Sequence, residues 1–72
     1  MESMLSEKDR EWARGFNVSK ENIEIFRQEL IQAEENGSYR VYKKDIREMD
    51  DDEIKVAYSN MRNYLSDMRT RH

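Results

Sequence analysis

The fold is decided by residues 49–68, which read MDDDEIKVAYSNMRNYLSDM. Five apolar side chains recur in this stretch at intervals of four, three, four and three: Ile54, Tyr58, Met61, Leu65 and Met68. This spacing is typical of an amphipathic helix, and about 20 helical residues span roughly 30 Å. Such a stripe has to be covered, either by the rest of the chain or by another molecule. The sequence therefore predicts a helical packing module.

The same stretch begins with four consecutive acidic residues, Asp50–Glu53. Asp50 and Glu53 fit a capping box, in which each side chain accepts a hydrogen bond from the backbone N–H of the other residue. Four carboxylates also suggest a metal site, but consecutive helical positions point about 100° apart and cannot all converge on one ion. The glycine of a calcium loop is missing as well. We expect a helix cap and no metal.

Serine caps indicate two further helices. Ser6 precedes a short helix over residues 7–14, which Gly15 is placed to end in the left-handed conformation. Ser19 precedes a second helix, whose end we place at Asn36-Gly37. The apolar side of this second helix consists of Ile23, Phe26, Leu30 and Ala33.

The segment between the second and third helices has the two-residue period of a strand. Tyr39 and Val41 alternate with Arg40 and Tyr42. A lone strand leaves its backbone groups unpaired, so the segment is either an extended, solvated link or half of a strand pair with another chain. Helix continuing back from the next segment is the third alternative. A single helical turn at 46–49 follows, because Asp45 begins a second capping box.

Together these elements predict an all-α fold, with one domain over residues 1–72 that is frayed at both termini. The helices are short, medium and long, and one extended segment precedes the last. We expect a small bundle with the second helix antiparallel to the third and the first lying across them. Only 36% of the 72 residues are hydrophobic, so the core is marginal. Its expected members are Trp12, Phe16, Ile23, Phe26, Leu30, Ile46, Ile54, Tyr58, Met61 and Leu65.

Composition narrows the classes of function. The sequence has no cysteine and no apolar run of transmembrane length, and residues 1–4 lack the basic and apolar regions of a signal peptide, so we expect a cytoplasmic location. The single histidine, His72, is the last residue, and no serine has a base placed near it. We therefore predict that the chain is not an enzyme and uses no cofactor or small-molecule substrate.

The third helix is longer than the second by a turn or more, so its end should overhang the bundle. We predict that this end forms a homodimer interface, and that the chain is a small regulator or adaptor of another protein. Tyrosine and methionine suit such a surface, because they bring contact area and adapt to varied partners. The predicted interface residues are Tyr58, Met61, Tyr64, Leu65 and Met68.

Two other functions remain open. A basic and aromatic cluster could contact nucleic acid through stacking and phosphate binding. Its members are Tyr39, Arg40, Tyr42, Lys43, Lys44 and Arg47. Alternatively, the first and second helices could occupy a basic groove on a partner, because negative charge gathers there; residues 17–36 carry five acids against two bases. The net charge of −3 argues against a surface wholly devoted to nucleic acid.

Overall fold

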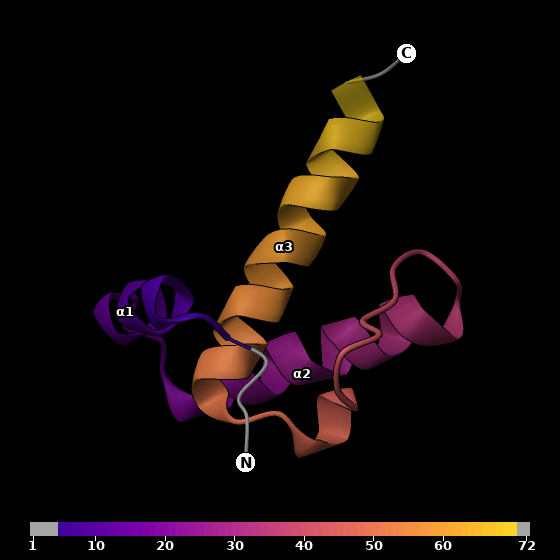
Figure 1. Cartoon of the computed structure of the whole chain (residues 1–72). Helices are drawn as coiled ribbons and strands as arrows, with labels where there is room; N and C mark the ends of the chain where they lie inside the picture. Colours follow the sequence, from indigo (N-terminus) through magenta and orange to yellow (C-terminus); the bar gives the residue numbers. More distant parts are fainter. Residues whose placement is uncertain (1–4, 71–72) are drawn as a thin grey trace.

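The computed structural model describes the backbone of residues 5–70 and the side chains of residues 5–69. In chain order it contains α1 (Glu7–Gly15), α2 (Lys20–Glu35), a 3₁₀ turn η1 (Ile46–Glu48) and α3 (Asp51–Thr70), as Figure 1 shows. The described part of the chain has no strand. The helices have 9, 16 and 20 residues, which confirms an all-α fold of short, medium and long helices. The predicted fraying of the termini and His72 lie outside the described residues.

The predicted serine caps are confirmed. The hydroxyl of Ser6 accepts the backbone N–H of Asp9 at 3.2 Å, and that of Ser19 accepts the N–H of Asn22 at the same distance. These local bonds satisfy backbone donors that the first turn of a helix leaves unpaired.

The two glycines behave differently. Gly37 follows the end of α2 with a φ of 78°, the left-handed conformation that glycine accepts without strain. The prediction for Gly15 is wrong, because Gly15 is the last residue of α1 and its φ is not positive. Instead, the N–H of Phe16 bonds to the carbonyl of Ala13 at 3.1 Å, and the chain leaves the helix in an extended conformation at Phe16.

The predicted antiparallel pairing of α2 and α3 is wrong, because the two helices begin side by side. Lys20 Nζ lies 3.9 Å from Asp51 Oδ2, and each residue is the first of its helix. One to two turns further on, the rings of Phe26 and Tyr58 stack at 3.9 Å with an interplanar angle of 5°. Beyond this contact the helices diverge, and the end of α3 projects from the body (Figure 1).

The length of the link between α2 and α3 explains this arrangement. The link runs back along α2, and the Arg27 side chain of α2 donates a hydrogen bond to the carbonyl of Ile46 at 2.7 Å. About eight extended residues span roughly 26 Å, close to the roughly 24 Å of a 16-residue helix. The chain can therefore return to the start of α2 before α3 begins.

Residues 38–44 form the predicted extended link, not a helical continuation. The two-residue alternation is real: Tyr39 and Val41 pack against the core, whereas Arg40 and Tyr42 are exposed. A strand pair between this segment and another chain stays a hypothesis.

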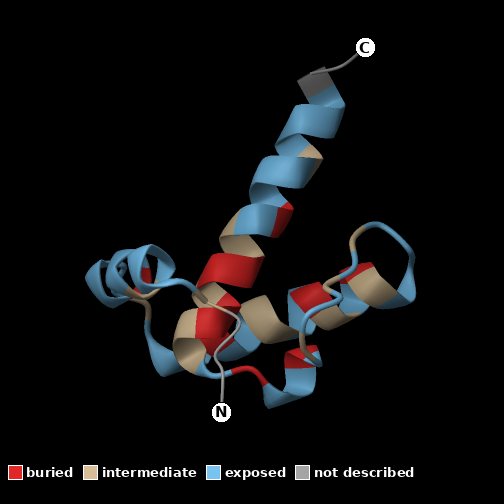
Figure 2. Cartoon of the chain, viewed as in Figure 1, coloured by how far each residue is buried: buried red, intermediate tan, exposed pale blue. Residues whose placement is uncertain are grey.

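The core lies where α2, η1 and the first half of α3 meet, as the red segments in Figure 2 show. It consists of Ile23, Leu30, Ala33, Ile46, Met49, Ile54, Ala57 and Met61. Five of the predicted core residues are among these, and Phe26, Tyr58 and Leu65 pack against them partly buried.

The core prediction is wrong for Trp12 and Phe16, which are 46% and 40% exposed. Fully buried Ala13 is the residue that α1 turns toward α3, and the adjacent Trp12 points about 100° away from it. A small side chain lets the short helix approach α3 closely, and the two large rings stay outside. Trp12 and Phe16 contact each other instead, with ring centroids 5.3 Å apart.

The overhang predicted for the third helix is confirmed. From Arg62 to Arg69, every residue of α3 is exposed except Leu65, which is half-buried (Figure 2). Among the described residues, no helix is long and apolar enough to cross a membrane.

Candidate protein-interaction site

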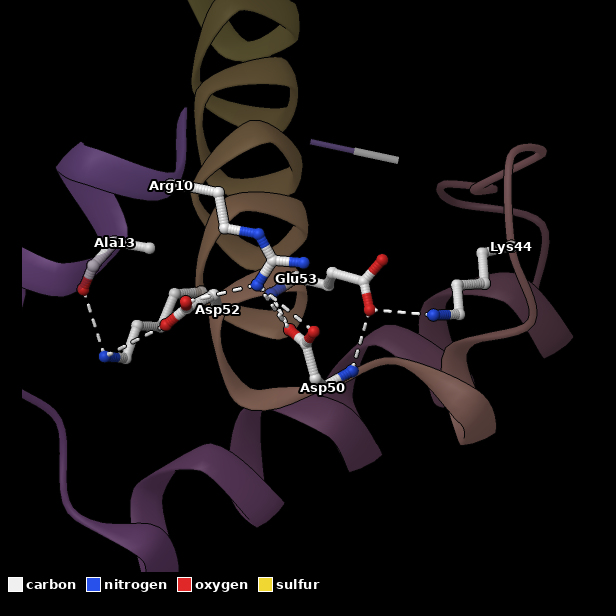
Figure 3. A network of polar contacts seen from close by, with 7 residues as sticks. Arg10, Ala13, Lys44, Asp50, Asp52 and Glu53 are labelled. Atoms are coloured by element: carbon white, nitrogen blue, oxygen red, sulfur yellow. Dashed lines mark hydrogen bonds and ion pairs between the residues drawn. The ribbon is translucent and has the colours of Figure 1, made fainter. Parts of the chain in front are cut away.

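The start of α3 is fixed by the predicted capping box (Figure 3). Asp50 Oδ1 accepts the N–H of Glu53 at 2.9 Å, and Glu53 Oε1 accepts the N–H of Asp50 at 2.9 Å. Both bonds satisfy donors at the positive end of the helix dipole, where carboxylates are stabilising. The interpretation of these acids as a cap is therefore confirmed.

Glu53 has a second role that the sequence did not reveal. Its side chain is fully buried, and Oε1 also accepts a hydrogen bond from Lys44 Nζ at 2.9 Å (Figure 3). The other oxygen, Oε2, has no hydrogen-bond partner among the described residues. Because a buried charge needs a partner, this ion pair holds the link that carries Lys44 against α3.

Arg10 joins α1 to the same end of α3. Its guanidinium lies 3.1 Å from Asp50 Oδ2 and 3.2 Å from Asp52 Oδ2. Partial burial by itself would raise the pKa of Asp50, but the hydrogen bond from the Glu53 backbone and the Arg10 charge outweigh it. The pKa of Asp50 therefore lies below its ordinary value of 3.8.

Lys55 completes the attachment of α1, since its Nζ donates to the carbonyl of Ala13 at 3.1 Å. The acids at the start of α3 are thus engaged in capping and in ion pairs. Among the described residues, no group of three His, Cys, Asp or Glu side chains could hold a metal ion.

Two of the predicted interface residues are used within the chain. Met61 is buried in the core. Tyr58 stacks on Phe26, and its hydroxyl lies near the carboxylate of Glu29. Burial and Glu29 together raise the pKa of the Tyr58 hydroxyl above its ordinary value of 10.0. Neither residue is fully available to a partner.

The other three predicted interface residues lie on the projecting end of α3. Tyr64 and Met68 are exposed, Met68 to 52%, and Leu65 is half-buried between them. The Tyr64 ring lies 5.4 Å from that of Tyr39, so one edge of this surface is fixed by the link. We call Tyr64, Leu65 and Met68 the α3 end surface.

The predicted nucleic-acid segment is only partly available. Lys44 is paired with Glu53, and Arg47 lies 3.6 Å from Asp45. Tyr39 is half-buried, and this burial, with the nearby Tyr64, raises the pKa of its hydroxyl.

Four members of that segment are exposed, and Arg40, Tyr42 and Lys43 are those that form no ion pair among the described residues. The Arg40 guanidinium lies over the Tyr42 ring, 5.9 Å from its centroid. A hollow of about 280 Å³ adjoins them, with Val56 and Asn60 of α3 among its lining residues.

Sequence reasoning missed a cleft between α1, α2 and α3. Its volume is about 210 Å³, and its walls are mainly rings: Trp12, Phe16, Phe26 and Tyr58. Ser59, Arg62 and Asn63 of α3 complete the lining. We call this the aromatic cleft. Trp12 and Phe16 were assigned to the core, and no pattern in the sequence distinguishes a core ring from a ring that lines an open cleft.

Comparison with protein-family models, with curated proteins and with solved structures finds no match for this chain.

Proposed function

We propose that this chain is a small non-catalytic helical module that binds other protein chains, acting as a homodimeric regulator or adaptor. The observation that supports binding to other chains is the α3 end surface, where Tyr64 and Met68 are exposed and Leu65 is half-buried on a helix that projects from the body. A helix already held at its capped end loses little conformational freedom on binding, which favours association.

The composition of the projecting end supports a contact role. Tyrosine, methionine and arginine are the residue types enriched at protein interfaces, and Arg62 and Arg69 accompany Tyr64 and Met68 here. A helix end that contacts only solvent typically carries charged residues of both signs. It does not typically carry three large apolar side chains as well.

The size of the surface indicates how it is used. Partly exposed side chains of this kind offer on the order of 100 Å² each, whereas a standard interface buries about 800 Å² on each partner. A flat contact over three residues is too small. A projecting helix can instead enter a groove and be covered on several sides, as in helix-in-groove recognition.

Site-specific photo-crosslinking tests the proposal in the cells that make the protein. A photoreactive phenylalanine analogue replaces Met68, and a control chain carries it at Glu48, which is exposed on η1 at the opposite end of the molecule. We expect discrete protein adducts from position 68 that Leu65→Glu abolishes. Equal adduct patterns at both positions, or adducts that persist in Leu65→Glu, would contradict the proposal.

Binding of nucleic acid through residues 39–47 has less support, because Lys44 and Arg47 are held in ion pairs. We expect no salt-sensitive retention of the chain on immobilised single-stranded DNA or RNA. Retention that Lys43→Glu removes would favour this alternative instead.

The other alternative is that a basic groove on a partner binds the acidic side of α2. The exposed acids there are Glu21, Glu24, Glu29 and Glu35. If this alternative holds, replacing these four residues by lysine should remove the crosslinked adducts.

A further inference from the structure

We infer that the aromatic cleft is a self-association site, in which Ile25 of a second copy of this chain enters the cleft of the first, and the reverse. The inference rests on the proposed function, since it names the surface through which the homodimer forms. It leaves the α3 end surface to other contacts.

Ile25 is an exposed aliphatic side chain on α2, with 54% of its surface uncovered. It lies one turn before Glu29, and residues four apart share a side of a helix. Glu29 lies near the hydroxyl of Tyr58, and Tyr58 lines the aromatic cleft. Ile25 also directly precedes Phe26, which lines the cleft, so we place Ile25 beside the cleft and not among its lining residues.

The exposed large apolar side chains of the described residues fall into two groups. One group consists of residues that line the cleft or directly precede a residue that lines it, and the other lies on the link and the end of α3. The first consists of Trp12, Phe16 and Ile25, and the second of Tyr42, Tyr64 and Met68. Apolar area gathered on one side and left uncovered typically marks a contact surface.

A surface that carries both a protruding side chain and a neighbouring cleft can pair with an identical surface, because each side chain can fill the cleft of the other copy. In a two-fold dimer each copy uses the same patch, so an axis between Ile25 and the cleft fills both clefts at once. The cleft volume of about 210 Å³ is below the roughly 300–1,000 Å³ of sites that enclose drug-sized ligands. It suits a single apolar side chain better than a small molecule.

Charge supports the same occupant. Arg62 is the charged residue among those that line the cleft, and it forms no ion pair within residues 5–69. Glu21 lies one turn before Ile25 and likewise has no ion pair there. A second copy that inserts Ile25 brings Glu21 toward Arg62, where opposite charges fix the register of the contact.

Light scattering of the purified full chain over a range of concentrations tests the inference. We expect the molar mass to rise from 8.8 kDa toward twice that value as concentration increases. Ile25→Glu should stay monomeric where the wild type is dimeric. Tyr42→Glu, which replaces a large side chain that is even more exposed and lies outside the face, should dimerise normally. All of these positions are exposed, and circular dichroism verifies that each variant stays helical.

A charge exchange tests the pairing itself. Arg62→Glu should weaken the dimer at least tenfold, and adding Glu21→Arg to it should restore the wild-type affinity. A wild type that is monomeric at every concentration, or a dimer that survives Ile25→Glu, would overturn the inference. A dimer that survives Ile25→Glu but is lost in Leu65→Glu would overturn it while supporting the α3 end surface as the site of self-association.

Discussion

Replacing Glu53 by alanine tests the buried ion pair at the start of α3. The change removes two hydrogen bonds of 2.9 Å, those that Oε1 accepts from Lys44 Nζ and from the N–H of Asp50. Breaking a buried ion pair by removing one partner costs about 3–5 kcal/mol. The Lys44 side chain is 35% exposed and can turn toward water, so we expect the lower value, about 3 kcal/mol.

This loss is large for a chain of 72 residues, whose total stability is on the order of 4–11 kcal/mol. At about 4–8 °C per kcal/mol, the melting temperature should fall by roughly 15 °C. Glu48→Ala is the matched control, because Glu48 stands three residues after Asp45 as Glu53 does after Asp50, but is exposed. The control should change stability by less than about 0.5 kcal/mol.

Urea unfolding followed by helical circular dichroism measures both free energies. A Glu53→Ala loss below about 1 kcal/mol, or one equal to that of Glu48→Ala, would refute the reasoning. A double-mutant cycle tests the pair separately from the cap. Lys44→Met alone leaves the Glu53 carboxylate buried without its cation. Lys44→Met with Glu53→Gln removes both charges and retains the capping oxygen, so the double variant should be the more stable of the two.

Three further predictions concern pH and the glycines. Because the pKa of Asp50 is lowered in the folded state, its contribution to stability is present above pH 3.8 and is lost as the pH falls through the lowered pKa. Asp50→Asn should therefore reduce the decrease in the urea midpoint measured between about pH 5 and pH 2. Because the pKa of Tyr58 is raised in the folded state, its contribution to stability is present below pH 10.0 and is lost as the pH rises through the raised pKa. Tyr58→Phe should therefore reduce the decrease in melting temperature at alkaline pH. Gly37→Ala should cost about 1 kcal/mol of stability, because φ is 78° at Gly37. Gly15→Ala should be neutral or stabilise the fold by up to about 0.5 kcal/mol, because a Cβ at Gly15 meets no atom within 4 Å. Thermal unfolding that ranks the two variants the other way would contradict this assignment.

The features that could be predicted from sequence are those that depend on neighbours along the chain. Ser6, Ser19 and the Asp50–Glu53 box each bond to backbone groups three residues away, so the residue types at that spacing are sufficient. The apolar stripe of α3 and the alternation in the link were also visible, because helix and strand periods are properties of one segment.

The features that were missed depend on contacts between distant segments. The periodicity of α1 is compatible with either Trp12 or Ala13 facing the body, and only the close approach of α1 to α3 selects Ala13. The direction of α2 relative to α3 depends on how far the link returns, which no residue type specifies. Glu53 was identified as a cap, but its burial follows from Lys44 on the link, nine residues earlier.

We propose that the exposed side chains at the end of α3, Tyr64 and Met68, form a contact surface and are not part of the core. The most direct measurement combines two readouts on one variant, Met68→Glu, with the photoreactive analogue placed at Tyr64. We predict that the free energy of unfolding changes by less than about 0.5 kcal/mol while the protein adducts from position 64 disappear. A large loss of stability, or adducts that persist in full, would contradict the account.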